Sequence, residues 1–428
     1  MRNLKIVKSS DRLDLVIFGA SGYTGRFVIP EMIRICKKYP DIRWAIAGRS
    51  KGKLEAALQD VAKVTGENVS GIKIILADAE DEESLRAMCS QCKLVMNCSG
   101  PFLWYGEALV KVAIDCKTDY IDVCSEPPFL EKVEKIYDAP ARDNGVFVIN
   151  ACGLGCLLAD LGVVYLQQQF QGTLNSVEAY LTTQPKTIKG WPSNVIRNST
   201  WEAMIHATTQ KPLWKGSDTN SRKVTQLEPE LKSRSCIHKR FNRWCVPFPG
   251  AEESIVQRTQ NYFKTTSRPV QFKRYHSLPS LVASLATTIG GYFLFILLKI
   301  FCLSGLFIKY PRLFSLGVVT YGDPDEAVMK QLVFDYQMVG VGWKREVQGA
   351  PKDKMVAKVY PIGKRNSPYE GTAIAAIYSA VTLLTERDRL PATCGVLTPG
   401  AAFRNTSIIE KFNNDNLKFE IDSKISCN

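Results

Sequence analysis

The sequence LDLVIFGASGYTGR, residues 13–26, decides the fold. Its first six residues are mostly apolar and include branched side chains, which predicts a buried strand, and residues 26–37 have the pattern of a helix. Between the two lie Gly19, Gly22 and Gly25, at GxxGxxG spacing. A buried strand, a glycine-rich turn and a helix in this order are typical of the Rossmann-type dinucleotide-binding fold.

Each glycine of this loop has its own physical reason. Gly19 allows the tight turn, Gly22 lets a pyrophosphate approach the backbone, and Gly25 lets the helix pack closely on the strand. Free N–H groups at the helix start then hold the phosphates. Three turn glycines without a ligand are the alternative. The residues expected to bind the cofactor here are Gly19, Ser21, Gly22, Tyr23, Thr24 and Gly25.

The end of the second predicted strand, residues 44–47, indicates which dinucleotide is bound. An NAD-specific site carries Asp or Glu there, to accept a hydrogen bond from the ribose 2′-hydroxyl. This chain has Arg49 and Ser50 instead, with Lys53 one helical turn later. A guanidinium and a hydroxyl favour a 2′-phosphate, and no carboxylate repels it. The expected cofactor is therefore NADP(H).

Three further residues are cofactor candidates because they follow predicted strands. Asp78 comes just after the third strand and could accept from the adenine amino group, although Asp is also a common cap at a strand end. Ser99 and Gly100 follow the fourth strand, where the nicotinamide half usually lies.

The rest of the chain predicts an α/β protein with two domains. Strands at 13–18, 44–47, 72–77, 94–98, 120–124 and 146–150 alternate with helix-length segments, which implies a doubly wound parallel sheet. Longer strands at 173–184, 332–348 and 353–361 and a helix at 201–208 indicate a second, α+β domain, and 211–242 resembles a surface loop. We expect a first domain at 1–165, completed by about 393–428, and a second at 166–392.

Residues 278–308 form a hydrophobic insert in the second domain. No residue from 281 to 298 is charged, a length of roughly 27 Å as a helix, and basic residues flank both ends. A buried core helix is the alternative to lipid contact. Because both flanks should share one compartment, we expect the segment to embed in a lipid surface without crossing it, bending at Gly290-Gly291 or Ser304-Gly305.

Composition narrows the environment and the partners. The chain has 55 Lys and Arg against 42 Asp and Glu, a formal net charge of +13, which favours anionic partners or reflects a generally basic surface. Basic runs interleaved with aromatics are missing, so nucleic acid is not expected. The 13 scattered cysteines predict reduced thiols in a cytosol-facing protein. The pair Cys89 and Cys92 lacks further ligands, so no metal site is expected.

Several segments together resemble the saccharopine dehydrogenase-like oxidoreductase family. They are VIFGASGYTGRFV, AIAGRS, LVMNCSGPFLWYGEALVKVAIDC, DYIDVCSE and GVLTPGAAF, which occur in the family's order along nearly the whole chain. The resemblance implies a Rossmann domain that is completed by the C-terminal segment, and a second α+β domain. It also implies that the insert corresponds to the apolar segment of animal members, which are associated with lipid droplets and membranes.

The chain departs from the family's pattern after the sixth strand. The family shows GFDSIPxDLG, whereas residues 153–162 read GLGCLLADLG, so Gly155 and Cys156 replace an Asp and a Ser. If those residues took part in chemistry, catalysis is weakened or absent; otherwise the segment only packs a helix start. The Gly of the family's DxxGE is likewise Ser125, although Asp122 and Glu126 remain.

Two residues are catalytic candidates. Glu126 and Tyr105 are expected on loops beyond strand ends, where ligands bind in such sheets, and either could donate a proton. Glu126 could equally cap a helix. Tyr360 and Lys364 have the spacing of a short-chain dehydrogenase dyad, but Pro361 and Gly363 between them forbid the necessary helix, and we reject this pair.

These observations predict an NADP(H)-dependent oxidoreductase at a lipid surface that acts on an apolar or lipid-like carbonyl or alkene. The alternative is a catalytically weak or inactive lipid-surface scaffold with a nucleotide-binding Rossmann domain. Expected partners are a lipid or membrane surface, a small apolar substrate and a second copy in a homodimer. The expected location is a lipid droplet or the cytosolic face of an intracellular membrane.

Overall fold

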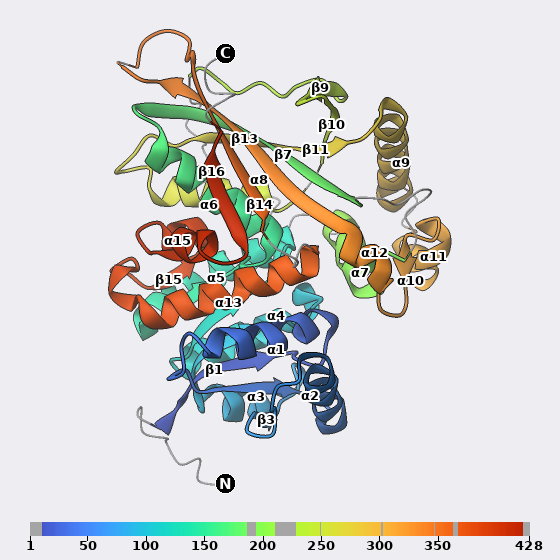
Figure 1. The fold of residues 1–428 in the computed structure, drawn as a ribbon, viewed down its shortest axis with the longest axis vertical. Coiled ribbons are helices and arrows are strands. Elements are labelled where there is room, and N and C mark those ends of the chain that lie inside the picture. The colour runs from blue at the N-terminus through green and yellow to red at the C-terminus, as the bar shows by residue number, and fades with distance from the viewer. Residues whose placement is uncertain are drawn as a thin grey trace. The chain divides into compact units, whose positions relative to one another are not determined.

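The computed structural model describes residues 11–185, 194–209, 228–248, 250–300, 303–345, 347–362 and 367–422. The chain forms two compact units, each built around a seven-stranded sheet. One unit holds Met1–Leu154 and Tyr369–Ile408, and the other holds Gly155–Pro368 and Ile409–Asn428. Figure 1 shows how α13, near the end of the chain, returns beside the N-terminal elements.

The first unit confirms the Rossmann-type fold. Its strands are ordered β15-β6-β5-β4-β1-β2-β3, and every neighbouring pair is parallel. The chain changes its direction of winding between β1 and β4, which is where doubly wound sheets bind ligands. The strands are β1 (Leu13–Phe18), β2 (Trp44–Gly48), β3 (Lys73–Leu76), β4 (Cys92–Asn97), β5 (Asp119–Asp122), β6 (Phe147–Ile149) and β15 (Gly395–Leu397).

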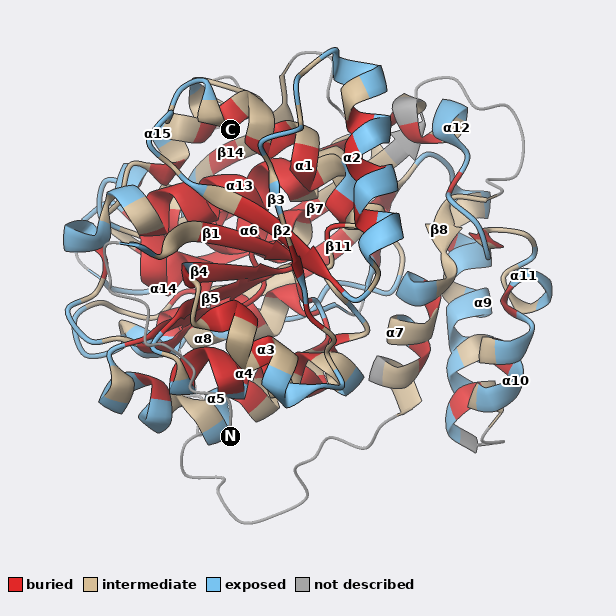
Figure 2. Ribbon diagram, turned by 90° about the horizontal axis from the view of Figure 1, so that it is seen from below, coloured by how far each residue is buried: buried red, intermediate tan, exposed pale blue. Residues whose placement is uncertain are grey.

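Helices alternate with these strands as the periodicity predicts. The central strands are mostly buried, as the red strands in Figure 2 show, because both faces of a parallel sheet are covered by helices. The helices are α1 (Tyr23–Cys36), α2 (Lys51–Thr65), α3 (Glu82–Cys89), α4 (Phe102–Asp115), α5 (Pro127–Asn144), α13 (Pro368–Thr385) and α14 (Pro399–Phe403).

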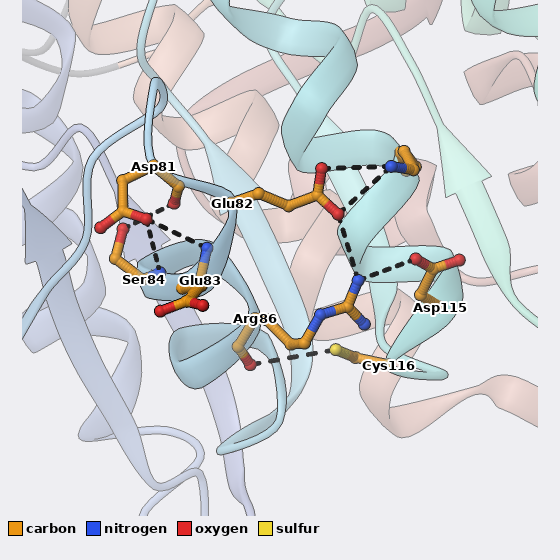
Figure 3. A network of polar contacts seen from close by, with 8 residues as sticks. Asp81, Glu82, Glu83, Ser84, Arg86, Asp115 and Cys116 are labelled. Carbon is orange, nitrogen blue, oxygen red and sulfur yellow. Dashed lines mark hydrogen bonds and ion pairs between the residues drawn. The ribbon is translucent and has the colours of Figure 1, made fainter. Parts of the chain in front are cut away.

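A polar network fixes α3 against α4 (Figure 3). Asp81 caps α3 by accepting from two amides of its first turn. Arg86 pairs with Glu82 at 3.2 Å and with Asp115 at 3.1 Å, and Lys111 reaches Glu82 at 3.1 Å. The two cations lower the pKa of the Glu82 carboxyl. Such exposed pairs each contribute about 0–1 kcal/mol, so the network mainly sets the register of the two helices.

The second unit is an α+β sheet in the order β16-β14-β13-β7-β11-β10-β9. Only β7 and β11 pair in parallel. Helix α6 (Leu154–Gln169) packs closely on β13, because a Cβ at Gly162 would lie 2.4 Å from the Met338 sulfur, and α8 (Glu252–Tyr262) packs on β11. The strands are β7 (Thr173–Pro185), β9 (His238–Arg240), β10 (Arg243–Pro247), β11 (Gln271–Leu278), β13 (Leu332–Trp343), β14 (Asp353–Pro361) and β16 (Leu417–Ile421).

The structure divides the chain at other residues than the sequence suggested. Residues 393–428 do not all complete the first unit: β15 and α14 do, but β16 pairs with β14 in the second sheet. The reason is that β16 buries Leu417 and Phe419, and Phe419 contacts the Tyr165 ring of α6. Helix α13, which the sequence placed in the second domain, belongs to the first unit.

The expected loop at 211–242 lies partly outside the described residues, which exclude 211–227. Its end is not a loop, because β9 forms an antiparallel hairpin with β10. The hairpin was missed because β9 is only three residues long and basic, with no apolar alternation.

The hydrophobic insert forms α9 (Leu281–Ile300) and α10 (Ser304–Lys309), followed by α11 (Pro311–Phe314); residues 301–302 lie outside the described part. Helix α9 runs without a break through Gly290-Gly291, so the bend expected there is wrong. Neither glycine meets another group within 4 Å of its Cβ position, and a glycine in an otherwise apolar helix is tolerated. Ser304-Gly305 instead opens a new helix.

Helix α9 packs through one stripe only. Its Leu298 joins Trp201 and Ile205 of α7 (Asn198–Thr209), Phe307 of α10 and Val319 of the short strand β12 (Val319–Thr320) in a small core. The rest of α9 is mainly exposed, as its pale blue surface in Figure 2 shows. Among the described residues, α9 is the one helix long and apolar enough to span a membrane.

Candidate functional site

The glycine loop has the geometry that its spacing predicts. Gly19 adopts a φ of +79°, and a Cβ there would lie 2.8 Å from the Cβ of Ser99. The Gly22 amide donates to the Gly19 carbonyl at 2.9 Å, which closes the turn. A Cβ at Gly25 would lie only 2.3 Å from the Ala20 carbonyl oxygen, so only glycine lets α1 approach the loop this closely.

The N-terminus of α1 is uncapped by side chains. Gly22 is the N-cap, makes no side-chain hydrogen bond, and is followed by a first turn without acidic residues. The amides of Tyr23 and Thr24 therefore lie where a helix offers its positive end to an anion. The Tyr23 side chain itself packs against the ring of Tyr369, with ring centroids 4.6 Å apart, so only its backbone is a phosphate candidate. Ser21 places its hydroxyl oxygen 3.8 Å from the Cβ position of Gly48, at the end of β2.

The end of β2 presents the groups expected to read the adenosine ribose. Arg49 directly follows β2, is exposed, and makes no hydrogen bond or ion pair with any residue that the structure describes. Ser50 is the N-cap of α2 and its side chain makes no capping bond. The first turn of α2 carries no acidic residue. A guanidinium and a hydroxyl are thus free for a 2′-phosphate.

Asp78 acts as a cap at the end of its strand, which was the alternative to adenine binding. Its Oδ1 accepts from the Glu80 amide at 3.2 Å, and its carbonyl accepts from the Ser84 hydroxyl, so it shapes the turn into α3. Hydrogen bonding to an adenine amino group stays a prediction for Asp78.

The end of β4 meets the glycine loop. The Ser99 amide donates to Asn97 Oδ1 at 2.9 Å, and the close approach of Ser99 to Gly19 brings two predicted cofactor segments together. Gly100, by contrast, would accommodate a Cβ at 3.4 Å from the Phe102 ring, so no close approach within the chain requires glycine there.

Below this loop lies a buried polar network that the sequence analysis missed. Asp122 is fully buried and accepts from Tyr120 Oη at 3.1 Å, Asn150 Nδ2 at 2.7 Å and the Ala151 amide at 2.8 Å. Desolvation raises the pKa of the Asp122 carboxyl despite these bonds. Asn97 Nδ2 donates to the same Tyr120 hydroxyl. The available signal was that polar residues end three neighbouring parallel strands.

Glu126 has the contacts of a helix cap. Its Oε1 accepts from the Phe102 amide at 2.9 Å and its Oε2 from the Leu103 amide at 3.0 Å, at the start of α4. Burial raises the pKa of the Glu126 carboxyl, and these two amides oppose that shift. Both carboxylate oxygens are therefore engaged by backbone, and catalysis by Glu126 stays a prediction.

Tyr105 does not lie on a loop, as the sequence suggested, but in the first turn of α4. Gly100 and Pro101 already end the loop, and the helix begins at Phe102. The Tyr105 hydroxyl has no hydrogen-bond partner among the described residues and its side chain is partly exposed. Catalysis by Tyr105 likewise stays a prediction.

The paired cysteines 89 and 92 are buried thiols. Burial raises the pKa of both, that of Cys92 to about 12, so neither forms a thiolate at neutral pH. Among the described residues, no three His, Cys, Asp or Glu side chains group as metal ligands would.

Comparison with known proteins adds the family. Residues 15–149 match the profile described as "Saccharopine dehydrogenase NADP binding domain". A rat protein named "Saccharopine dehydrogenase-like oxidoreductase" is 33% identical over 425 residues, which are 96% of this chain and 97% of the rat protein. The chain belongs to the saccharopine dehydrogenase-like oxidoreductase family.

The names of other members of the saccharopine dehydrogenase-like family indicate different cellular locations. A Caenorhabditis elegans relative, 31% identical over 96% of this chain and 99% of its own length, is named "Lipid droplet localized protein". An Arabidopsis thaliana relative, 28% identical over 96% of this chain and 97% of its own, is named as probable and mitochondrial. Apo saccharopine dehydrogenase (L-Glu forming) from Saccharomyces cerevisiae shares the fold, with a TM-score of 0.55 over 96% of this chain and 100% of that one, at 14% identity.

The departure from the family pattern lies at the start of α6. Gly155 and Cys156 occupy its first turn, and Cys156 is buried. Farther along, Asp160 accepts from the Thr259 hydroxyl at 2.7 Å, which ties α6 to α8. The segment therefore packs a helix start, as the sequence allowed, but a Cβ at Gly155 would also lie 3.1 Å from Glu252 Oε1.

Proposed function

We propose that this chain is an NADP(H)-dependent oxidoreductase that works at a lipid surface on an apolar or lipid-like carbonyl or alkene. The observation that carries the cofactor choice is Arg49, an exposed guanidinium without a described partner at the end of β2. Family membership and the match of residues 15–149 support the same cofactor.

The residues fit the two phosphate-bearing parts of NADP(H). The uncapped start of α1 would hold the pyrophosphate, with Gly22 leaving room for it, and Arg49 with Ser50 would hold the 2′-phosphate. When bound, the cofactor supplies the hydride, so the protein needs to orient it and provide a proton. We assign the proton to Tyr105, because both oxygens of Glu126 are engaged by α4.

The lipid surface is proposed from the exposed face of α9. Val282, Ile289 and Phe293 are 75%, 65% and 61% exposed, although they are large apolar side chains. Large apolar side chains exposed together mark a surface that binds a protein, a ligand or a membrane, and the length and hydropathy of α9 favour a lipid surface. The neighbouring cations Lys299, Lys309 and Arg312 are exposed, and residues 278–312 contain no Asp or Glu. This charge suits anionic head groups.

The topology of the second sheet supports one arrangement of α9 at the lipid. Strand β11 ends at Leu278, just before α9, and β13 begins at Leu332, after the insert. Both strands pair with β7 along most of their length. A span that left the two flanks on opposite sides of a bilayer would pull this sheet apart. Helix α9 therefore lies in the interface, as an amphipathic or monotopic helix does.

The location we propose is a lipid droplet or the cytosolic face of an intracellular membrane. The name of the worm relative supports the droplet, and the name of the plant relative points to another organelle. Fluorescent tagging of the full chain in cells, with a neutral-lipid dye and a mitochondrial marker, distinguishes these locations.

The experiment that tests the activity is NADPH oxidation by the purified chain on phospholipid-coated oil droplets. The droplets carry either a long-chain ketone or a long-chain 2-enoyl ester. NADPH consumption with one of them, and not with plain droplets, supports the oxidoreductase. Tight NADPH binding without consumption on either substrate, or on total lipid extract, would favour the alternative function, a catalytically inactive lipid-surface scaffold. The departure from the family pattern at residues 153–160 is the feature that suggests this alternative.

A further inference from the structure

The second unit buries one ion pair beside the departure from the family pattern. Glu252, the first residue of α8, and Arg274 of β11 are 7% and 6% exposed, and their Oε2 and Nη1 atoms are 3.3 Å apart. Two charges are costly to bury, and losing one partner leaves the other uncompensated. The pair is therefore a specific feature of this fold and not an incidental surface contact.

Two glycines make room for the Glu252 carboxylate. A Cβ at Gly155 would lie 3.1 Å from its Oε1, and a Cβ at Gly250 would lie 2.1 Å from its Oε2 and 2.7 Å from Arg274 Nη1. Neither glycine has a left-handed φ, so backbone strain does not explain them. What they share is the absence of a side chain where the carboxylate lies.

Position 155 is where the family's pattern has an acidic residue. A short carboxylate on Gly155 would project into the space that Glu252 now fills, because its Cβ alone would already reach Oε1. We propose that the carboxylate beside Arg274 is supplied in this chain by Glu252 of α8, in the place that an aspartate at position 155 of α6 would take, and that Glu252 is a positioning residue for Arg274. The Gly155 departure is then a compensated exchange and not a loss.

The register of the second sheet shows which residue lies on the same face as Arg274. His276 of β11 and Tyr336 of β13 are both in register with Leu181 of β7, which places Arg274 and Tyr336 on one face. The Tyr336 hydroxyl lies 3.4 Å from the Gly155 carbonyl, and burial raises its pKa, so it stays a proton donor.

Arg274 Nε is buried and has no hydrogen-bond acceptor among the residues that the structure describes. Nη1 is held by Glu252 and the side chain also interacts with Tyr336, so the Nε–H is a donor that could bind an oxygen atom of a substrate, either a carbonyl or a carboxylate. This last step rests on the proposed oxidoreductase function, whereas the relocation of the carboxylate does not.

A double-mutant cycle tests the relocation by thermal unfolding of the full chain. Glu252→Ala should lower the melting temperature by about 5 °C or more, because it leaves the Arg274 charge buried alone. Gly155→Asp alone should also lower it, because two carboxylates would crowd one site. The combination of Gly155→Asp with Glu252→Ala should regain at least half of the loss caused by Glu252→Ala.

Two controls separate charge from packing. Gly155→Asn with Glu252→Ala has nearly the same shape as the rescuing pair but no charge, and it should not rescue. Glu253→Gln changes the neighbouring residue, whose Oε1 accepts from the Arg274 amide at 3.1 Å and whose Oε2 approaches Lys273 at 4.0 Å. Glutamine keeps the accepting oxygen and removes only the charge, so the melting temperature should stay within about 2 °C. If the Asp and Asn combinations behave alike, or Glu252→Ala has no effect, the relocation is wrong.

The catalytic consequence needs a second readout, NADPH oxidation on substrate-bearing droplets. Glu252→Ala should lower turnover at least tenfold at a temperature where it is still folded, with NADPH affinity unchanged, and the Asp combination should restore it. Rescue of stability without rescue of turnover would refute the substrate role alone. If the unmodified chain oxidises no NADPH, the proposed function fails, while the thermal cycle still decides the relocation.

Discussion

Arg49 stands directly after β2 with its guanidinium exposed, and the first turn of α2 offers it no carboxylate. We expect NADPH to bind the chain more tightly than NADH. Arg49→Asp should lower NADPH affinity about 10- to 100-fold, because one charge-assisted hydrogen bond is lost and a carboxylate repels the 2′-phosphate. NADH affinity should not fall, since Asp can accept from the 2′-hydroxyl. Calorimetric titration with both cofactors measures this.

The matched control for Arg49→Asp is Lys63→Asp. Lys63 lies in the last turn of the same helix, is exposed, and approaches only Asp60, at 4.0 Å. Lys63→Asp makes the same change of charge at a position away from the proposed 2′-phosphate site, so the preference for NADPH over NADH should not change. Equal affinities of the unmodified chain for NADPH and NADH would refute the role of Arg49.

Residues could be predicted from the sequence where their neighbours in space are also neighbours in the chain. The glycine loop and Arg49 each depend on one strand and the helix after it, so spacing alone indicated them. Glu252, Arg274 and Gly155 meet only through the second sheet, and no local pattern joins them. The capping role of Glu126 was likewise only one of two alternatives, because the amides it binds belong to another helix, α4.

At the scale of the element, two glycines of the α1 loop should respond differently to substitution. Gly22 has φ −74° and ψ 173°, a conformation open to any residue, and its Cβ would meet only the Gly19 carbonyl oxygen, at 3.1 Å. Gly22→Val should therefore fold with a melting temperature close to that of the unmodified chain but bind no NADPH. Gly25→Ala should lower the melting temperature and also abolish NADPH binding. The reason is that α1 must move away from Ala20, at a cost of roughly 1–3 kcal/mol.

Gly52→Ala controls for the glycine substitutions. Gly52 lies in the first turn of α2, close to Arg49 in sequence, and a Cβ there meets nothing within 4 Å. Alanine should stabilise α2 slightly and leave NADPH affinity unchanged. Unchanged NADPH affinity in Gly22→Val, measured by the same titration, would show that the loop does not hold the pyrophosphate.

Elements were predictable where periodicity is strong. The strands at 13–18 and 353–361 have the predicted bounds, because a buried apolar run marks the first and alternation extends through the second. The short strands β9 and β10 were missed, since β9 is three basic residues and the apolar part of β10 is only Trp244, Cys245 and Val246. The bend at Gly290-Gly291 was also wrong, because a helix tolerates glycine where nothing forces the backbone to turn.

At the scale of the whole chain, the sequence could predict the two sheets but not which one each C-terminal segment joins. Strands β15 and β16 are both short and close together in the chain, yet β15 pairs with β6 and β16 pairs with β14. The pairing depends on long-range partners that single-sequence patterns do not encode. A homodimer stays a prediction, which light scattering of the purified chain would test.

The last prediction concerns the exposed face of α9. Val282→Asp, Ile289→Asp and Phe293→Asp together should release the chain from anionic droplets or vesicles into the soluble fraction, because three charges would enter the hydrocarbon boundary. Their exposure means that the melting temperature should hardly change. Leu298→Ser, at the buried stripe, should instead lower it, since Leu298 is 3% exposed. Val64→Asp on α2, where valine is 86% exposed, controls for an apolar residue away from the patch.

Protease treatment of the chain bound to sealed vesicles then tests the topology. Because β11 and β13 both pair with β7, the residues before and after α9 must lie on the same side of the lipid. Tags at both termini should therefore be cut from outside equally. Protection of the C-terminal tag alone would require α9 to span the bilayer and the second sheet to be broken. Vesicles without anionic lipid should bind more weakly, because Lys299, Lys309 and Arg312 each contribute about 1 kcal/mol near a negative surface.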